Sequence, residues 1–298
     1  MRPSTLPLLA LLLFAGTAPA FAGGAWVPRP GEGWAQLGAS RKTAQSSWSS
    51  RGETLHNQQD HDFRYGYLSG EAGVWKGLAA NWTITYLNGL EGRPDDLEEN
   101  NGLSDAWFGL EYGFRQDSTW PLAVGFTVRT PIFYDQEGPY DRHTFNEDGS
   151  FRGVNPEWRG VLKHDYTVSF AASRSLWQGK GWTSGETGYT WREGAPADQI
   201  PAYGEVGVPL PWLGLRAKGT ALYIQALGND SPRQPDDRFG SRPGFNFNNA
   251  SMGRLGASLM LPIDSGERWW LEAGYNRWVW GKSTRQYNEP FLSFGRSF

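Results

Sequence analysis

The residues of this chain with the most chemical potential are charged side chains that recur at every second position of segments otherwise rich in small and apolar residues. Alternate side chains of an extended strand share one face, so these charges lie opposite an apolar set. If the apolar face meets lipid, the charged face lines the interior of a closed sheet. The predicted interior residues carry both signs: Glu71, Asp105, Glu111, Arg129, Asp165, Glu186, Glu205, Arg216, Lys218, Arg254 and Glu272.

Two interpretations of this charged interior stay open from the residues alone. Opposite charges can satisfy one another's desolvation and fill a narrow barrel as a rigid salt-bridge network. They can instead line a polar conduit or binding site with charge selectivity, for which Glu111, Arg129, Arg216 and Lys218 are the main candidates. Barrel width does not decide, because a twelve-stranded barrel lies between filled eight-stranded barrels and wide open porins.

Catalysis is a third possibility, and the histidines test it. The chain has four: His56, His61, His143 and His164. A serine hydrolase needs Ser, His and an acid to converge, yet Ser169 is five residues from His164 and so lies on the other face of the same predicted strand. No metal-ligand spacing occurs, and Asp60-His61-Asp62 fits a solvated loop end better than an acid–base cluster. We therefore expect no enzyme, cofactor or metal, and lipid or ester hydrolysis is the least favoured function.

Period-2 alternation supplies the elements that position these charges. It predicts about twelve strands, each near the ten residues that a tilted membrane strand needs. The clearest strand alternates Leu122, Val124, Phe126 and Val128 with smaller or polar residues. Arg174 is an exception on the apolar face, which requires a bulge, another register or a position among lipid headgroups. The predicted spans are 33–43, 61–74, 79–89, 103–114, 120–131, 161–176, 182–192, 201–210, 213–227, 250–262, 268–280 and 287–298.

The connections between these strands alternate strictly between long polar loops and short turns. Long loops are predicted at 44–60, 90–102, 132–160, 193–200, 228–249 and 281–286, and short turns at 75–78, 115–119, 177–181, 211–212 and 264–267. Outer-membrane barrels show this pattern, with short periplasmic turns, long external loops and both termini in the periplasm. The pattern predicts an all-β protein, a transmembrane antiparallel up-and-down β-barrel of about 12 strands. Seven tryptophans beside short turns are assigned to a periplasmic aromatic girdle: Trp75, Trp120, Trp177, Trp182, Trp212, Trp269 and Trp270.

Two of the long loops carry many charges. Loop 132–160 mixes aromatic and charged residues, so it could fold inward as a constriction or lie on the surface against its own aromatic rings. Loop 228–249 contains several Asp and Arg residues, but its Asp spacing matches no Ca²⁺ loop, and we expect it to be solvated.

The N-terminal segment has the features of a secretory signal peptide. Arg2 precedes a short apolar run at 8–14, and Ala20-Phe21-Ala22 forms a small-x-small cleavage site. We expect residues 1–22 to be removed and residues 23–298 to form one barrel domain. Removal takes away one arginine and no acid, so the net charge falls from −3 to about −4, which argues against nucleic acid as a partner. The exported chain has no cysteine and no apolar stretch near 20 residues, which excludes a disulfide framework and a helical membrane protein.

The segment that follows, Gly24-Ala25-Trp26-Val27-Pro28-Arg29-Pro30-Gly31-Glu32-Gly33-Trp34-Ala35-Gln36-Leu37-Gly38, resembles the opening of a family of bacterial outer-membrane β-barrel transporters associated with the meta-pathway of phenol degradation (MetA-like). The resemblance covers about 15 residues. It implies a monomeric barrel and uptake of small, aromatic compounds, and it supplies no site residues.

The C-terminal strand carries the expected signal for the barrel assembly machinery, which we assign to Phe298. Arg296 departs from the usual pattern, which has an aromatic or apolar residue there. Either the assembly machinery recognises this strand more weakly, or the Arg296 side chain reaches the membrane interface. Taken together, the sequence favours an outer-membrane channel or uptake protein for small solutes, with aromatic solutes as candidates. The alternative is a closed structural or ligand-binding barrel that displays its external loops. The expected partners are the outer-membrane lipid bilayer, the assembly machinery and a small-molecule solute.

Overall fold

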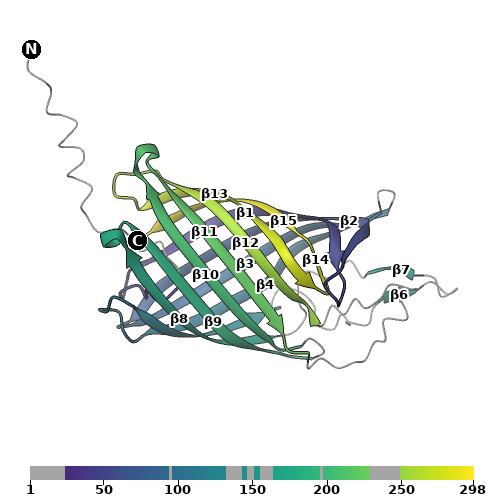
Figure 1. Cartoon of the computed structure of the whole chain (residues 1–298), viewed down its shortest axis with the longest axis horizontal. Coiled ribbons are helices and arrows are strands. Elements are labelled where there is room, and N and C mark those ends of the chain that lie inside the picture. The colour runs from purple at the N-terminus through teal and green to yellow at the C-terminus, as the bar shows by residue number, and fades with distance from the viewer. Residues whose placement is uncertain are drawn as a thin grey trace, which may run out of the picture.

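A computed structural model of the chain describes residues 24–93, 96–131, 143–145, 151–154, 164–194, 197–228 and 249–298. Within these residues, twelve long antiparallel strands form one closed barrel, so the predicted fold class is confirmed (Figure 1). The strands are β1 (Gly33–Trp48), β2 (Thr54–Trp75), β3 (Leu78–Arg93), β4 (Asp96–Gly113), β5 (Leu122–Thr130), β8 (Asp165–Leu176), β9 (Gly181–Arg192), β10 (Gln199–Leu210), β11 (Leu215–Ala226), β12 (Ser251–Pro262), β13 (Trp269–Lys282) and β15 (Asn288–Ser297).

Closure of the barrel depends on β1, which pairs with β2 on one side and with β15 on the other. The β1–β15 register runs from Trp34 opposite Ser297 to Thr43 opposite Asn288. Just beyond it, Gly33 and Phe298 exchange two backbone hydrogen bonds of 2.9 Å each. A closed sheet has no free edge, so every strand can satisfy its backbone groups inside lipid.

The two ends of the barrel differ, as Figure 1 shows. Gly24 and Phe298 lie at the end with the short turns, among them the 3₁₀ turns η1 (Trp177–Gly179) and η2 (Pro211–Leu213). The paired ends of the β1–β2 hairpin lie at the other end. In outer-membrane barrels the short turns and termini face the periplasm, so we name these the periplasmic end and the external end.

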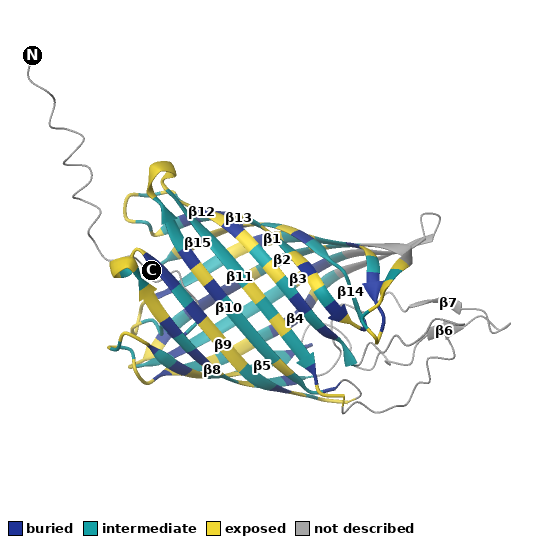
Figure 2. Cartoon of the chain, viewed as in Figure 1, coloured by how far each residue is buried: buried dark blue, intermediate teal, exposed yellow. Residues whose placement is uncertain are grey.

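Apolar side chains cover the outside of the barrel. Exposed and less exposed positions alternate along each strand (Figure 2), and the exposed ones include Leu37, Phe126 and Leu259. Leu37, for example, is 64% exposed. An exposed apolar belt of this size would be unfavourable in water. The belt is therefore the face that meets lipid, and the opposite parity faces the lumen. Separately, among the described residues no helix is long and apolar enough to span a membrane.

The predictions of long loops at 44–60 and 90–102 were wrong. β1 continues to Trp48 and β2 begins at Thr54, while β3 reaches Arg93 and β4 begins at Asp96, so both hairpins extend as paired strands past the belt. Outside the membrane both faces of a strand are in water, and no apolar alternation is required. Polarity alone therefore cannot distinguish a strand extension from a loop.

Two of the seven tryptophans assigned to the periplasmic girdle face the lumen instead. Trp182 and Trp270 are 8% and 3% exposed and lie on lumen parity, whereas Trp75 and Trp212 are 73% and 76% exposed beside their turns. Strand parity decides the difference, since neighbouring residues point to opposite faces. Arg174 is outward in a regular register with β9, and its guanidinium carbon lies 5.2 Å from the ring centroid of Trp120. The headgroup position is thus the one that fits Arg174.

Parts of the predicted loops lie outside the described residues. Within 132–160 only β6 (His143–Phe145) and β7 (Phe151–Val154) are described, and they pair as a separate hairpin. The inward-folding expectation for this loop, the solvated loop at 229–248 and the signal segment 1–22 fall on residues that are not described.

Candidate functional site: the charged lumen

The structure places all eleven predicted interior residues at strand positions that face the lumen. Each alternates along its strand with the lipid-facing positions, as Thr127 and Arg129 do with Phe126 and Val128. Seven of them form ion pairs with other lumen or rim residues: Asp105, Arg129, Asp165, Arg216, Lys218, Arg254 and Glu272. The salt-bridge interpretation therefore applies to a large part of the interior.

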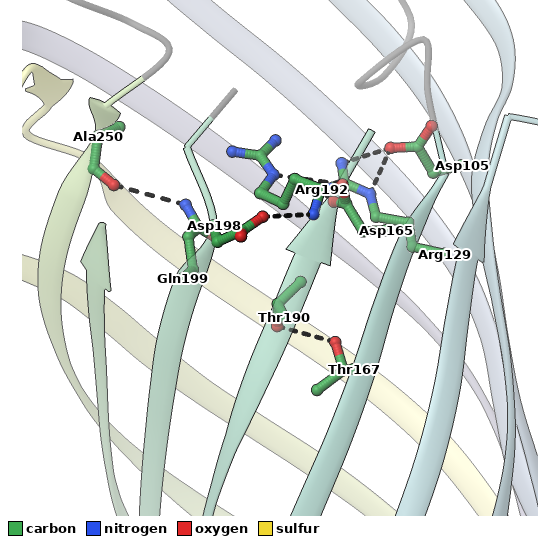
Figure 3. Close-up of polar contacts among 9 residues, drawn as sticks. All are labelled: Asp105, Arg129, Asp165, Thr167, Thr190, Arg192, Asp198, Gln199 and Ala250. Carbon is green, nitrogen blue, oxygen red and sulfur yellow. Dashed lines mark hydrogen bonds and ion pairs between the residues drawn. The ribbon is translucent and has the colours of Figure 1, made fainter. Parts of the chain in front are cut away.

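A first ion cluster crosses four adjacent strands near the external end (Figure 3). Arg129 Nε donates to Asp105 Oδ2 at 2.6 Å, and its Nη1 lies 3.6 Å from Asp165 Oδ2. Arg192 Nε donates to Asp165 Oδ1 at 3.2 Å, and the backbone N–H of Arg192 donates to Asp198 Oδ1 at 2.9 Å. Asp105 is fully buried, and a buried carboxylate without a cation partner would be costly. The alternating acidic and basic side chains of this cluster therefore compensate one another.

A second ion cluster lies on the wall formed by β12, β13, β15, β1 and β2. Glu289 is its centre and lies 3.6 Å from Lys42 Nζ and 3.9 Å from Arg254 Nη1. The Lys42 ammonium also lies 4.4 Å from the ring centroid of Tyr65 and 5.7 Å from that of Trp278, within cation–π range. This cluster combines two cations, one carboxylate and two aromatic rings.

The two clusters face each other across the lumen. β4, β5, β8 and β9 are separated from the second wall by β3 on one side and by β10 and β11 on the other. Arg129 of the first cluster is nevertheless close enough for its charge to act on Lys42 and Tyr65 of the second. Three cations, Lys42, Arg129 and Arg254, thus converge in the external half of the lumen.

Toward the periplasmic end, the charged lumen groups Glu205 on β10, Arg216 and Lys218 on β11 and Glu272 on β13 each have a polar or charged partner. Glu205 accepts hydrogen bonds from Trp182 Nε1 at 2.5 Å and from the Tyr203 hydroxyl at 2.7 Å. Glu272 lies 2.7 Å from Lys218 Nζ and accepts from the Ser258 hydroxyl at 2.6 Å. Arg216 pairs with Glu267 in the β12–β13 turn. These groups stabilise the wall, and Arg216 and Lys218 are held by acids rather than free to meet a solute.

Glu71, Glu111 and Glu186, here the glutamate row, are different, because in the described part of the chain no cation pairs with any of them. Glu71 is 6% exposed; its Oε2 accepts from Trp34 Nε1 at 3.2 Å, and its Oε1 has no partner. Glu111 Oε1 also lacks a partner, and Glu111 is within electrostatic range of both Glu71 and Glu186. The periplasmic half of the lumen thus carries three acidic side chains that have no cation partner among the described residues.

The N-terminal arm, residues Gly24–Pro30, lies inside the periplasmic mouth. The backbone N–H of Ala25 donates to Ser173 Oγ at 2.9 Å, and that of Val27 donates to Gln116 Oε1 at 3.0 Å. Gln116 Nε2 donates back to the Ala25 carbonyl at 2.7 Å. Ala25 is fully buried against Ala123 and Ala171, which face the lumen on β5 and β8. The arm therefore narrows the periplasmic opening.

The arm runs directly beneath the glutamate row. An added Cβ at Gly73 would lie 2.1 Å from the Arg29 carbonyl, one at Gly113 2.9 Å from Val27 Cγ2, and one at Gly24 2.7 Å from Ser184 Cβ. Gly73, Gly113 and Ser184 are each two residues from a member of the row, on the periplasmic side. A solute leaving the barrel would meet the glutamates and then the arm.

Sequence reasoning missed several lumen residues. Lys42, Arg192 and Glu289 lie within predicted strands and on lumen parity, so extending the parity count to both strand ends would have found them. The arm carries no alternation signal, because it is not a strand, and its contacts with Ser173 and Gln116 span 148 and 89 residues.

The described residues do not bring His164 and Ser169 together. The His164 ring lies 6.2 Å from the ring of outward-facing Tyr166, while Ser169 faces the lumen. In the ranges described above, no group of three or more histidine and acidic side chains could hold a metal ion.

Comparisons with known proteins agree with the fold. No family model and no curated protein matches the chain. The solved structure of the COG4313 outer membrane channel from Pseudomonas putida F1 matches with a TM-score of 0.62 at 12% identity, over 93% of this chain and 99% of that one. The KdgM porin matches at 0.50 with 5% identity, over 88% and 99%, and the NanC porin at 0.50 with 8% identity, over 89% and 100%. The chain therefore has the fold of outer-membrane channels and porins.

Proposed function

We propose that this outer-membrane barrel is a channel for small solutes whose interior charges set selectivity. One observation carries the proposal: charge is separated along the lumen, because Lys42 and Arg254 share the single carboxylate of Glu289 in the external half, whereas no cation among the described residues pairs with the glutamate row in the periplasmic half. A barrel filled only for stability would pair these charges, because unpaired buried charge is costly. Rings of charge along a pore are what channels use to discriminate ions. The solved structures that share this fold are channels and porins, which supports the same function.

The second ion cluster points to the class of solute. Rings of Phe63, Tyr65, Trp278 and Tyr287 gather around Lys42, with centroid separations from 5.4 to 6.4 Å between neighbours. Aromatic faces stack on flat rings, and the convergent cations attract an acidic group. A small aromatic acid or phenol fits this chemistry. The resemblance of residues 24–38 to transporters of the phenol meta-pathway points the same way.

The closed barrel remains a second candidate because of the arm. Ala25 and Val27 occupy the periplasmic mouth and are held by three hydrogen bonds to lumen and turn side chains. If the arm never leaves, the barrel binds a ligand from outside without passing it. We also propose that residues 1–22 are a cleaved signal, that Phe298 is read by the barrel assembly machinery, and that the protein is not an enzyme.

Planar-bilayer conductance of the refolded protein, with and without residues 24–30, tests the channel. We expect a small conductance in the full barrel and a larger one after deletion of the arm. A barrel that stays silent even without the arm would overturn the channel and leave the closed barrel.

Benzoate and phenol, added as blockers, test the solute class. Lys42→Met should weaken benzoate block, whereas Lys282→Met, an exposed residue at the end of β13, should not. Replacing the glutamate row by glutamines should lower the cation-to-anion permeability ratio. Equal block of wild type and Lys42→Met would refute the assigned role of the second cluster.

A further inference from the structure

The outer wall has a groove that interrupts the apolar belt. One row of directly paired residues runs across four strands in the order Leu292 (β15), Ala39 (β1), Gly66 (β2) and Tyr86 (β3). Two small residues thus lie between two large ones that are 50% and 47% exposed. The resulting depression has a volume of about 560 Å³ and an apolar lining. Its size falls in the range of small-molecule sites.

Two arginines stand side by side at the external end of this groove. Arg41 and Arg64 are directly paired across β1 and β2, one position pair beyond Ala39 and Gly66 on the same outward face. Their side chains are 57% and 58% exposed. Like charges directly opposite one another destabilise a sheet, and here they share one carboxylate, Asp62, at 2.7 and 3.8 Å. Among the side chains that the structure describes here, two guanidinium groups thus share one carboxylate, which leaves one positive charge on the outside of the barrel.

The height of the arginines matches the boundary between hydrocarbon and headgroups. Arg64 lies ten residues along β2 from Val74, which is exposed beside the periplasmic turn. At about 3.3 Å per residue and a tilt of about 40°, that distance is roughly 25 Å along the membrane normal, the height of the apolar belt of such barrels. The groove therefore lies in the outer half of the belt, with the arginines at headgroup level.

We propose that this surface binds one molecule of lipid A, the bis-phosphorylated, acylated glycolipid of the outer leaflet. Arg41 and Arg64 bind a phosphate, because paired guanidinium groups form charge-assisted hydrogen bonds to phosphate oxygens. An acyl chain lies over Ala39 and Gly66, between Leu292 and Tyr86. The charge and the groove are adjacent and on one face, which matches a ligand with an anionic head and an apolar tail. The site depends on an outer-membrane location but not on solute passage.

Native mass spectrometry of the refolded full chain in detergent, with hexa-acylated lipid A added, tests the site. Three variants separate its parts. R41Q/R64Q removes the charge, and G66L fills the groove, where an added Cβ meets only Tyr86 Cβ at 3.9 Å and folding should be preserved. R174Q removes an outward arginine at the periplasmic end and is the matched control. Phosphatidylglycerol and dephosphorylated lipid A are the comparison lipids.

We expect one retained lipid A on the wild type and on R174Q, and about tenfold less on R41Q/R64Q, as loss of one charge-assisted contact predicts. G66L should also bind about tenfold less, because leucine occupies the groove in which the acyl chain would lie. Dephosphorylated lipid A should bind as weakly to the wild type as intact lipid A does to R41Q/R64Q. Equal binding of phosphatidylglycerol and lipid A, or equal binding by R41Q/R64Q and wild type, would overturn the proposal. Bilayer conductance is measured separately, so a silent channel with intact lipid A binding refutes only the channel.

Discussion

Replacing Gln116 by alanine should release the N-terminal arm. Gln116 makes two of the hydrogen bonds that hold it, accepting from Val27 N–H and donating to the Ala25 carbonyl. Each such bond contributes about 1 kcal/mol net, so their loss costs roughly 2 kcal/mol. That free energy raises the population of detached arm about 30-fold. The arm can respond so strongly because its few contacts must offset the entropy of ordering seven residues.

Thiol labelling measures this population directly. The chain has no cysteine, so Val27→Cys introduces a single thiol of similar volume in the arm. We expect a soluble maleimide to label this thiol about 30-fold faster in the Gln116→Ala background. Gln286→Ala serves as the control, because Gln286 accepts a hydrogen bond from Ser46 at 2.8 Å at the external end, far from the arm. An unchanged labelling rate in Gln116→Ala would refute the assigned anchoring.

Three further predictions concern the walls and one turn. Arg129→Gln should lower the free energy of unfolding by about 3–5 kcal/mol in urea titrations, because buried Asp105 loses its guanidinium partner; exposed Arg277→Gln should have little effect. Trp182→Phe should cost about 1–3 kcal/mol through the lost hydrogen bond to Glu205, whereas Trp212→Phe, 76% exposed, should cost almost nothing. The Trp269 backbone N–H and then Arg268 hold the pKa of Asp264 below its usual value, so the β12–β13 turn should be fully stabilised above about pH 4 and loosen as pH falls through that lowered pKa. Amide exchange at Trp269 should then rise on acidification, and Asp264→Asn should remove this pH dependence.

Much of the barrel could be predicted because its rule is local. Lipid on one side and water on the other impose a period of two, so the set Leu122, Val124, Phe126 and Val128 identifies both a strand and its outer face. From the sequence alone, the same alternation predicts that Glu71 and Arg129 face the lumen. Where both faces of a strand are wet, as beyond Ala44 on β1, the rule disappears, and the strand extensions were taken for loops.

The arrangement of the candidate sites was not available from local patterns. Lys42 and Arg129 belong to opposite walls and come into electrostatic range only because the sheet closes at β1 and β15. Ala25 reaches Ser173 because the arm turns into the mouth of that closed barrel. The outer groove exists because strand register brings Ala39 opposite Gly66. The sequence by itself determined strands, faces and the sign of each charge, since these depend on neighbours along the chain. Which charges meet, which stay unpaired and which surfaces are hollow depended on closure and register, and only the tertiary structure decided them.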